Sequence, residues 1–176
     1  ETPWLRDANN EREQKQMLVR LFDGNQLQNR LSTTLTSLKK LQNPDGSFSW
    51  WPGMKGSLYM TVSVIKTLVR LQTLTDKMET SAIVDAAFRY LDKRVGEEVA
   101  NMKKYEKKYK TLLFPMDDLC DYLYSNALAG RKATPDVNYL LDRLSKKPTD
   151  LTIYGKARTA VILQQYNKVE KAKEYL

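Results

Sequence analysis

The sequence predicts an all-helical protein built from helical hairpins. Apolar residues recur at spacings of three and four along most of the 176 residues, which is the period of an amphipathic α-helix. No segment shows the sustained alternation of apolar and polar residues that predicts a strand. Glycines, prolines and capping residues interrupt the helical pattern at short intervals. Together these observations predict about seven to nine helices with short connections.

The first 75 residues contain three predicted helices and one unusual loop. Asp7 or Asn10 is a candidate cap for a first helix that reaches about Phe22 and ends at the Asp23-Gly24 pair. A second helix begins near Asn25, and its apolar stripe consists of Leu27, Leu31, Leu35, Leu38 and Leu41. The loop of residues 42–57 follows, and a third helix is predicted from there to about residue 74.

The rest of the chain continues the helical pattern. A helix is predicted over residues 81–110, with Gly96 as a possible break because glycine costs about 1 kcal/mol relative to alanine inside a helix. Further helices are predicted from Pro115 to about residue 129, from Thr134 to about 147, from a cap at Thr149 or Asp150 to 166, and over 168–176. Such helix–turn–helix units, recurring at roughly 35 to 50 residues, are typical of helical repeats. They bury their faces either as an open solenoid or as a closed ring.

Composition excludes several classes of catalytic site. The chain has no histidine and a single cysteine, which removes Ser-His-Asp and Cys-His nucleophiles and the zinc sites that need imidazole or several thiolates. The lone Cys120 lies on the apolar side of its predicted helix with Leu123, so we expect a small buried residue. We therefore predict no enzymatic activity and no catalytic, metal-binding or cofactor-binding residues.

The net charge of +8 raises the question of a nucleic-acid partner. Its densest basic run covers residues 102–110. On a helix, one stripe contains Val95, Val99, Met102, Tyr105 and Tyr109, and the lysines occupy the other faces. This pattern is typical of an amphipathic helix with a solvated face. We predict no nucleic-acid partner, and no membrane contact because no apolar run approaches the roughly 20 residues of a membrane span.

The loop of residues 42–57 carries the most distinctive residues. Asn43 to Gly46 is predicted to form a tight turn, with Gly46 at the position that needs a positive φ. The candidate site residues follow it: Phe48, Trp50, Trp51, Met54 and Tyr59. Burial of the aromatic residues at a junction between hairpins is the favoured interpretation. The alternative is an exposed tryptophan pair that serves as a binding patch.

The same loop carries a resemblance to a known family. The pattern Leu38-x-x-Leu41-Gln42-x-x-Asp45-Gly46-x-Phe48-x-Trp50 resembles a motif of α/α-toroids, which are rings of helical hairpins found in terpenoid cyclases and complement thioester domains. The continuation from Trp50 to Thr61, together with the opening residues 1–4, is similar to the bacterial α2-macroglobulin family. The resemblance is distinctive over about the first 75 residues.

The resemblance implies a non-catalytic α/α-toroid module of a protein that traps proteases in the periplasm or cell envelope. Its partners would then be neighbouring domains of a parent chain and proteases. The family's Cys-x-Glu-Gln thioester motif is not found in this segment, because no Glu-Gln follows Cys120. A complete ring needs roughly 200 residues or more, so residues 1–176 are expected to form one helical domain with an incomplete ring. The exposed side of such a ring, with Trp4, Leu5, Met17, Leu18 and Leu21, would favour a homodimer of the isolated chain.

Two other functions stay open at this stage. One is a self-contained helical-repeat scaffold that binds a protein or a glycan. The other is a Mg²⁺-dependent isoprenoid enzyme, because Asp117, Asp118 and Asp121 form a DDxxD pattern that can hold Mg²⁺ against a diphosphate. The first two of these residues also fit the first turn of a helix, where acids stabilise the free N–H groups, and no second metal motif is found. The structural interpretation is therefore favoured.

Overall fold

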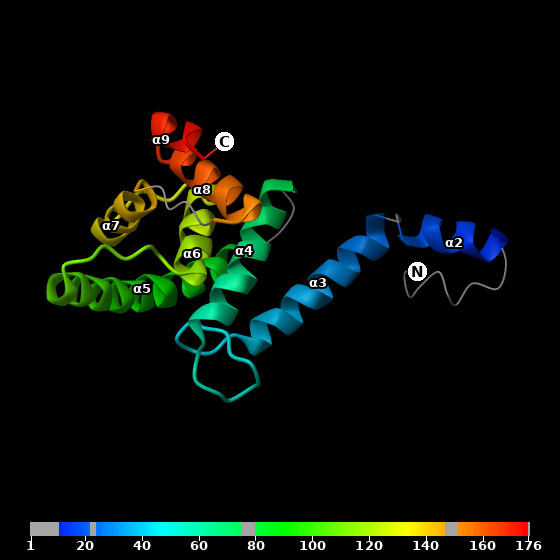
Figure 1. Cartoon of the computed structure of the whole chain (residues 1–176). Coiled ribbons are helices and arrows are strands. Elements are labelled where there is room, and N and C mark those ends of the chain that lie inside the picture. The colour runs from blue at the N-terminus through cyan, green and yellow to red at the C-terminus, as the bar shows by residue number, and fades with distance from the viewer. Residues whose placement is uncertain (1–10, 22–23, 75–79, 147–150, 176) are drawn as a thin grey trace. The chain divides into compact units, whose positions relative to one another are not determined.

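The computed structural model describes residues 11–21, 24–74, 80–146 and 151–175. Within these ranges the chain is all-helical and has no strand, which confirms the predicted class (Figure 1). The helices are α2 (Glu11–Leu21), α3 (Gly24–Leu41), α4 (Leu58–Leu74), α5 (Ser81–Tyr109), α6 (Asp117–Leu128), α7 (Pro135–Leu144), α8 (Ile153–Gln165) and α9 (Val169–Lys173). None of the described helices is long and apolar enough to cross a membrane.

The chain divides into two compact units, residues 1–41 and residues 42–176. The first unit contains α2 and α3, close to their predicted positions. The predicted caps Asp7 and Asn10 lie outside the described residues, as do Trp4 and Leu5 of the predicted dimer surface. Leu18 of that surface is exposed. The single-domain prediction and the homodimer both stay predictions.

Helices of the second unit stack in two rows, one of α4, α6 and α8 and the other of α5 and α7. Helix α6 packs between α4 and α8, while α5 packs against α4 and α7, and α9 covers α8. Figure 1 shows α5 along one edge of this unit, with α6 and α7 above it and α8 and α9 beyond them. Alternating helices that meet their second neighbours are the expected result of stacking hairpins. Because solenoids and rings share this stacking, the toroid stays a prediction.

The core lies between the rows and is mostly aliphatic. Each helix from α4 to α8 contributes its apolar stripe, and the largest fully buried side chains are Tyr122, Ile65, Leu91, Leu119, Leu123, Leu140, Leu141, Leu144, Ile162, Leu163, Val62 and Val69. Cys120 is also buried, as expected, and its Sγ donates to the carbonyl of Pro115 at 3.4 Å. Burial raises the pKa of the Cys120 thiol to about 12. A protonated thiol is a poor nucleophile.

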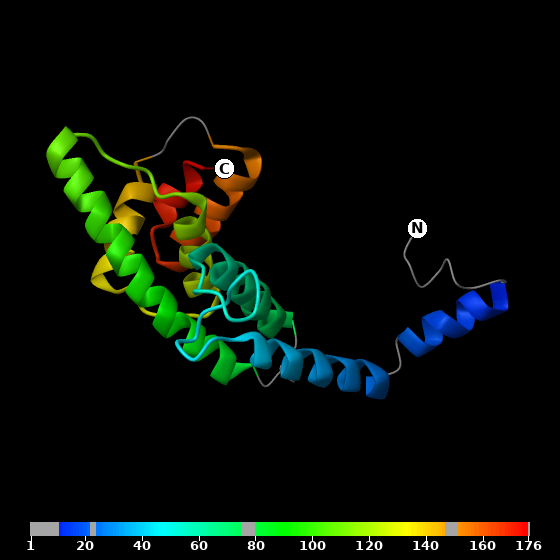
Figure 2. The same ribbon diagram turned by 90° about the horizontal axis from the view of Figure 1, so that it is seen from below.

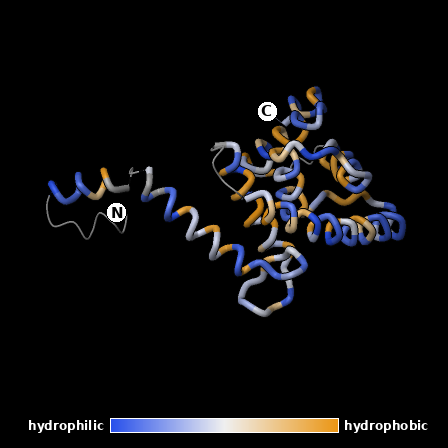
Figure 3. The backbone as a smooth tube through the Cα atoms, turned by 180° about the vertical axis from the view of Figure 1, so that it is seen from behind, coloured by the Kyte–Doolittle hydropathy of each residue, from blue (hydrophilic) through white to orange (hydrophobic). Residues whose placement is uncertain are grey.

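Helix α5 differs from its prediction in two respects. Gly96 does not break it, because the helix is continuous over 29 residues. The predicted apolar stripe is buried at Val95 and Val99, but Tyr105 and Tyr109 are exposed. In the last turns of α5, Arg143 of α7 binds Glu106, while the two tyrosines stay in contact with solvent. Those turns are mostly hydrophilic in Figure 3.

Helix starts in the second half are set by local capping. Helix α7 starts where it was predicted to start, and the side chain of Thr134 caps it by accepting a hydrogen bond from the amide of Val137. For α8 the predicted cap was wrong. The capping residue is Thr152, whose side chain accepts a hydrogen bond from the amide of Gly155. The predicted caps at 149 and 150 lie outside the described residues. Several Thr and Asp residues in one connection can each cap a helix, so spacing alone does not select among them.

Half-buried and buried ion pairs connect neighbouring elements of the second unit. Arg131, in the α6–α7 connection, binds both carboxylate oxygens of Asp92 on α5, at 3.0 and 2.7 Å. Tyr122 of α6 donates to the same carboxylate. Arg143 of α7 binds Glu106 of α5 through two parallel hydrogen bonds of 2.7 and 2.6 Å. Bidentate guanidinium–carboxylate pairs of this kind are the strong ones.

We predict that the Glu106–Arg143 pair makes folding stability depend on pH. The hydrogen bonds from Arg143 lower the pKa of Glu106 from about 4.5 to about 2. The carboxylate therefore stabilises the fold above about pH 4.5, and this contribution disappears as the pH falls towards 2. Glu106→Gln should lower the unfolding free energy by roughly 2–3 kcal/mol at pH 7, and the difference from the native chain should shrink below pH 4.

Urea denaturation at several pH values measures this dependence. Glu170→Gln is the matched control, because Glu170 is paired with Lys173 on the exposed face of α9. That variant should match the native chain within about 0.5 kcal/mol at every pH. A Glu106→Gln variant whose deficit is the same at pH 3 as at pH 7 would contradict the role given to the carboxylate charge.

Candidate functional site

The loop of residues 42–57 begins with the predicted turn. The amide of Gly46 donates to the carbonyl of Asn43 at 2.9 Å, and Gly46 has a φ of +89°. The side chain of Asp45 accepts from both the amide and the hydroxyl of Ser47, at 2.9 and 2.6 Å. These contacts confirm the tight turn. They also hold the carboxylate of Asp45 against the loop itself.

The turn is attached directly to the backbone of α5. A Cβ at Gly46 would lie 2.1 Å from the carbonyl oxygen of Ala86, so only glycine allows this approach. The side chain of Gln42 donates to the carbonyls of Gly46 and Ile83, each at 2.9 Å. Figure 2 shows the loop beside the amino-terminal half of α5. The loop is therefore attached to the main chain of α5 in two ways, by the side-chain hydrogen bond of Gln42 and by the close packing of Gly46.

Phe48 anchors the loop in the core. Its side chain is 4% exposed, and its amide donates to the hydroxyl of Thr61 on α4 at 2.9 Å. The amide of Ser57 donates back to the carbonyl of Phe48 at 2.9 Å. This hydrogen bond joins the two ends of residues 49–56, which form an excursion from the rest of the loop. The burial expected of the loop's aromatic residues is therefore found at Phe48.

The expectation that the tryptophans are buried was wrong. Trp50 is 55% exposed and Trp51 is 66% exposed, and Met54 and Tyr59 are also about half exposed. The rings of Trp50 and Tyr59 stack with centroids 5.6 Å apart. Among the aromatic residues of the loop, Phe48 is buried and the tryptophans lie on the excursion outside it. We call the four residues Trp50, Trp51, Met54 and Tyr59 the aromatic surface.

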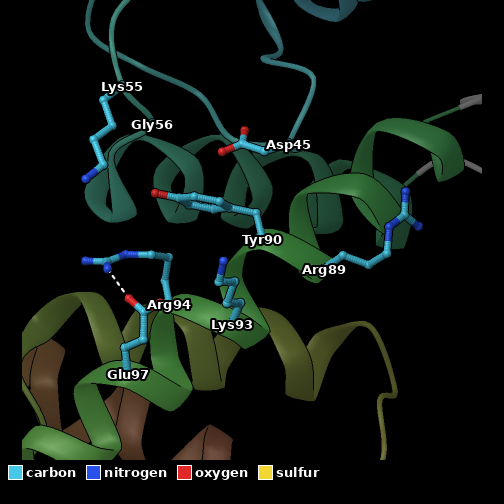
Figure 4. Close-up of a pocket in the computed structure, with 8 residues that line it drawn as sticks. All are labelled: Asp45, Lys55, Gly56, Arg89, Tyr90, Lys93, Arg94 and Glu97. Atoms are coloured by element: carbon cyan, nitrogen blue, oxygen red, sulfur yellow. Dashed lines mark hydrogen bonds and ion pairs between the residues drawn. The ribbon is translucent and has the colours of Figure 1, made fainter.

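A pocket of about 400 Å³ lies between the loop and α5. Figure 4 shows Tyr90 extending from α5 towards Gly56, with its hydroxyl on the same side as the ends of Lys55 and Arg94. We call it the cationic pocket, and its lining residues are Asp45, Lys55, Gly56, Arg89, Tyr90, Lys93, Arg94 and Glu97. Four of these side chains are cationic and two are carboxylates, so the lining carries a surplus of two positive charges.

Both carboxylates of the pocket already have partners. Asp45 is bound by Ser47, and Glu97 pairs with Arg94. Lys55, Arg89 and Lys93 form no ion pair within the described residues. Burial raises the pKa of Tyr90 above its usual value near 10, so its hydroxyl stays protonated at neutral pH and can donate a hydrogen bond. The pocket therefore offers cationic groups and a hydroxyl to an anion.

The acidic residues of the DDxxD pattern occupy a different place. Arg158 of α8 is almost fully buried and donates to Asp117 at 2.6 Å and to Asp121 at 2.8 Å. Lys66 of α4 pairs with Asp121 as well. The two carboxylates thus bind cations of the chain and connect α4, α6 and α8. Among the described residues, no cluster of three or more acidic or thiol side chains is placed to hold a metal ion.

The sequence located the aromatic surface but did not identify the cationic pocket. Lys93 and Arg94 follow Tyr90 at spacings of three and four, which places them on the same face of a helix, and this local cluster is the one signal that the sequence carries. Lys55 lies more than 30 positions away and reaches the cluster only because Gly46 brings the loop onto α5. The aromatic surface and the cationic pocket are also neighbours along the chain, because Met54 immediately precedes Lys55.

We predict that Gly46→Ala disrupts the docking of the loop. The new Cβ would collide with the backbone of α5, and alanine would be strained at a φ of +89°. We expect a loss of unfolding free energy of about 3 kcal/mol or more, of which strain alone gives roughly 1–2. Gly53→Ala is the control, because Gly53 has a φ of +81° with nothing within 4 Å. Equal losses in urea denaturation would contradict the docking contact.

We also predict that truncating Phe48 and truncating Trp51 have very different effects on the free energy of unfolding. Phe48→Ala removes a buried side chain and should lower the unfolding free energy by about 3–5 kcal/mol. Trp51→Ala removes an exposed one and should change it by no more than about 0.5 kcal/mol. Thermal or urea denaturation of both variants makes the comparison. A loss from Trp51→Ala as large as that from Phe48→Ala would show that the tryptophan is buried.

Comparisons with known proteins identify no relative of this chain. No family model matches it, and neither a curated protein nor a solved structure was found that resembles it. The fold class and the geometry of the loop are therefore inferred from the sequence and the structure of this chain alone. The similarity to α2-macroglobulins stays a prediction from residues 1–75.

Proposed function

We propose that this chain is a non-catalytic helical module that binds another protein through the aromatic surface. The observation that carries the proposal is the exposure of Trp50, Trp51, Met54 and Tyr59 on a loop that is held at Gln42, Gly46 and Phe48. Tryptophan, tyrosine and methionine are enriched at protein interfaces. A loop that is already ordered loses little entropy when it binds, which favours affinity.

The non-catalytic part of the proposal is supported by the state of the reactive groups. Cys120 is buried and protonated, and Asp117 and Asp121 bind Arg158. The chain has no histidine. An isoprenoid enzyme would need the DDxxD carboxylates to be directed at Mg²⁺ and a diphosphate, whereas two of them are bound to cations of the chain.

The resemblance in residues 1–75 supports a finer proposal. The module would belong to an α2-macroglobulin-like protein of the periplasm or cell envelope, and the surface that it contacts would be a trapped protease or a neighbouring domain of the parent chain. The self-contained scaffold is the competing proposal. Reading the coding sequence on both sides of these residues distinguishes them: macroglobulin-type β-domains support the first, and a start codon next to Glu1 supports the second.

We predict that the aromatic surface is needed for retention of a protease by the full-length protein. The probe is trypsin, added in limiting amount and followed by gel filtration. The variant Trp50→Ser/Trp51→Ser should retain at least about fivefold less trypsin than the native protein, since loss of interface tryptophans typically costs more than 1 kcal/mol each. The matched control is Tyr105→Ser/Tyr109→Ser, which removes exposed rings from the end of α5.

Three results are informative. Retention that falls only with the tryptophans supports a protein-binding loop. Equal retention by all three proteins contradicts a role for the aromatic surface in trapping. Absence of retention even by the native protein contradicts the macroglobulin proposal.

A further inference from the structure

The cationic pocket holds positive charge that the fold does not use. In the second unit, Arg131, Arg143 and Arg158 each bind a carboxylate of another element. Lys55, Arg89 and Lys93 form no such pair within the described residues, although all three line one pocket. Like charges that are gathered without partners repel one another and lower stability. Such an arrangement is expected where an anion from outside supplies the missing charge.

The donors of the pocket are aimed at a common volume. Lys55 comes from the clamped loop, and Tyr90 and Arg94 come from consecutive turns of α5. Figure 4 shows the hydroxyl of Tyr90 on the same side of the pocket as the ends of Lys55 and Arg94, the latter paired with Glu97. Gly56 lies close to Tyr90: a Cβ there would be 3.2 Å from the Tyr90 hydroxyl, although its main collision would be with Oγ of Ser47 at 2.1 Å. An oxyanion at this end would meet N–H and O–H donors from two elements.

The ligand should carry apolar groups as well as negative charge. The backbone of Met54 leads directly into Lys55, so the aromatic surface and the cationic pocket are continuous along the chain. The side chain of Asn43 donates to the carbonyl of Met54 at 3.4 Å, which holds this junction to the turn. A pocket of about 400 Å³ accommodates one or two side chains rather than a polymer, so the rest of the ligand would lie across the aromatic surface.

We propose that the cationic pocket binds the carboxylates of an acidic peptide segment of the partner protein, whose apolar residue packs on Trp50 and Tyr59. This inference rests on the proposed function, because it names the chemistry that the aromatic surface and its neighbour would recognise. A second copy of this chain is a poor occupant, since its net charge is +8. A continuous phosphate backbone is also a poor occupant, because a pocket of about 400 Å³ has room for one or two side chains and not for a polymer.

The test uses the whole chain and a defined probe. The probe is the peptide acetyl-Glu-Glu-Phe-Glu-Glu-amide, titrated by calorimetry at low salt, with the glutamine analogue acetyl-Gln-Gln-Phe-Gln-Gln-amide as its neutral counterpart. The acidic peptide should bind at least about tenfold more tightly than the neutral one, and its affinity should fall as salt is raised. Glucuronate and inorganic phosphate are titrated in parallel to represent an acidic glycan and a phosphate ligand.

Matched charge variants locate the site. The variant Lys55→Gln/Lys93→Gln removes two charges from the pocket. The control variant Lys104→Gln/Lys107→Gln removes two exposed charges from the carboxyl-terminal end of α5, away from the pocket. The first should weaken the acidic peptide about tenfold, and the second less than about twofold. Both pairs are on the surface, and unchanged melting temperatures show that the variants are folded.

Four results would overturn the proposal: no binding of the acidic peptide at millimolar concentration, equal binding of the neutral peptide, equal weakening by both double variants, or tighter binding of phosphate or glucuronate at the pocket. The trypsin retention assay is independent of these outcomes. If the tryptophan variant loses trypsin but the peptide fails to bind, the pocket assignment is wrong and the protein-binding loop stands. If peptide binding depends on Lys55 and Lys93 but retention is unaffected, the pocket stands and the trapping role is wrong.

Discussion

The contact between Gly46 and the backbone of α5 is the constraint on which the site depends. It leaves no space for a side chain, and it is accompanied by the two hydrogen bonds of Gln42, one to the loop and one to Ile83. A loop of polar and aromatic residues would otherwise be free to move. Because its base is attached to α5 through Gly46 and to α4 through Phe48, residues 49–56 project from a defined position. Both the aromatic surface and one wall of the cationic pocket follow from that attachment.

The loop therefore separates two tasks that its composition does not distinguish. Phe48 stabilises the fold from inside, while Trp50 and Trp51 remain in contact with solvent. The same separation holds for charge. Guanidinium groups of Arg131, Arg143 and Arg158 connect helices through carboxylates, whereas the cations around Tyr90 have no comparable role in the fold. A module with these properties is suited to binding, because its exposed groups can be changed at little cost in stability.

Much of the fold could be predicted from the sequence, because helical periodicity and the Asn43–Gly46 turn are local signals. The exceptions are non-local. Tyr105 and Tyr109 continue the apolar stripe of α5 in the sequence, but α7 meets the last turns of α5 at Glu106 instead. Trp50 and Trp51 resemble core residues by type, but Phe48 is the aromatic residue of the loop that lies in the interior. The cationic pocket could not be predicted, since Lys55 and Arg94 meet only after the loop docks on α5.

Amide hydrogen exchange along residues 43–61 is the most direct measure of whether the loop is a preformed binding platform. The amides of Gly46, Phe48 and Ser57 each donate to a group of the loop or of α4. If the loop is docked as described, these three amides should exchange as slowly as those in the middle of α4. The amides of Trp50 and Lys55, at the outer part of the excursion, should exchange faster. Uniformly fast exchange from residue 43 to residue 57 would contradict the account, because the aromatic surface would then have no fixed position.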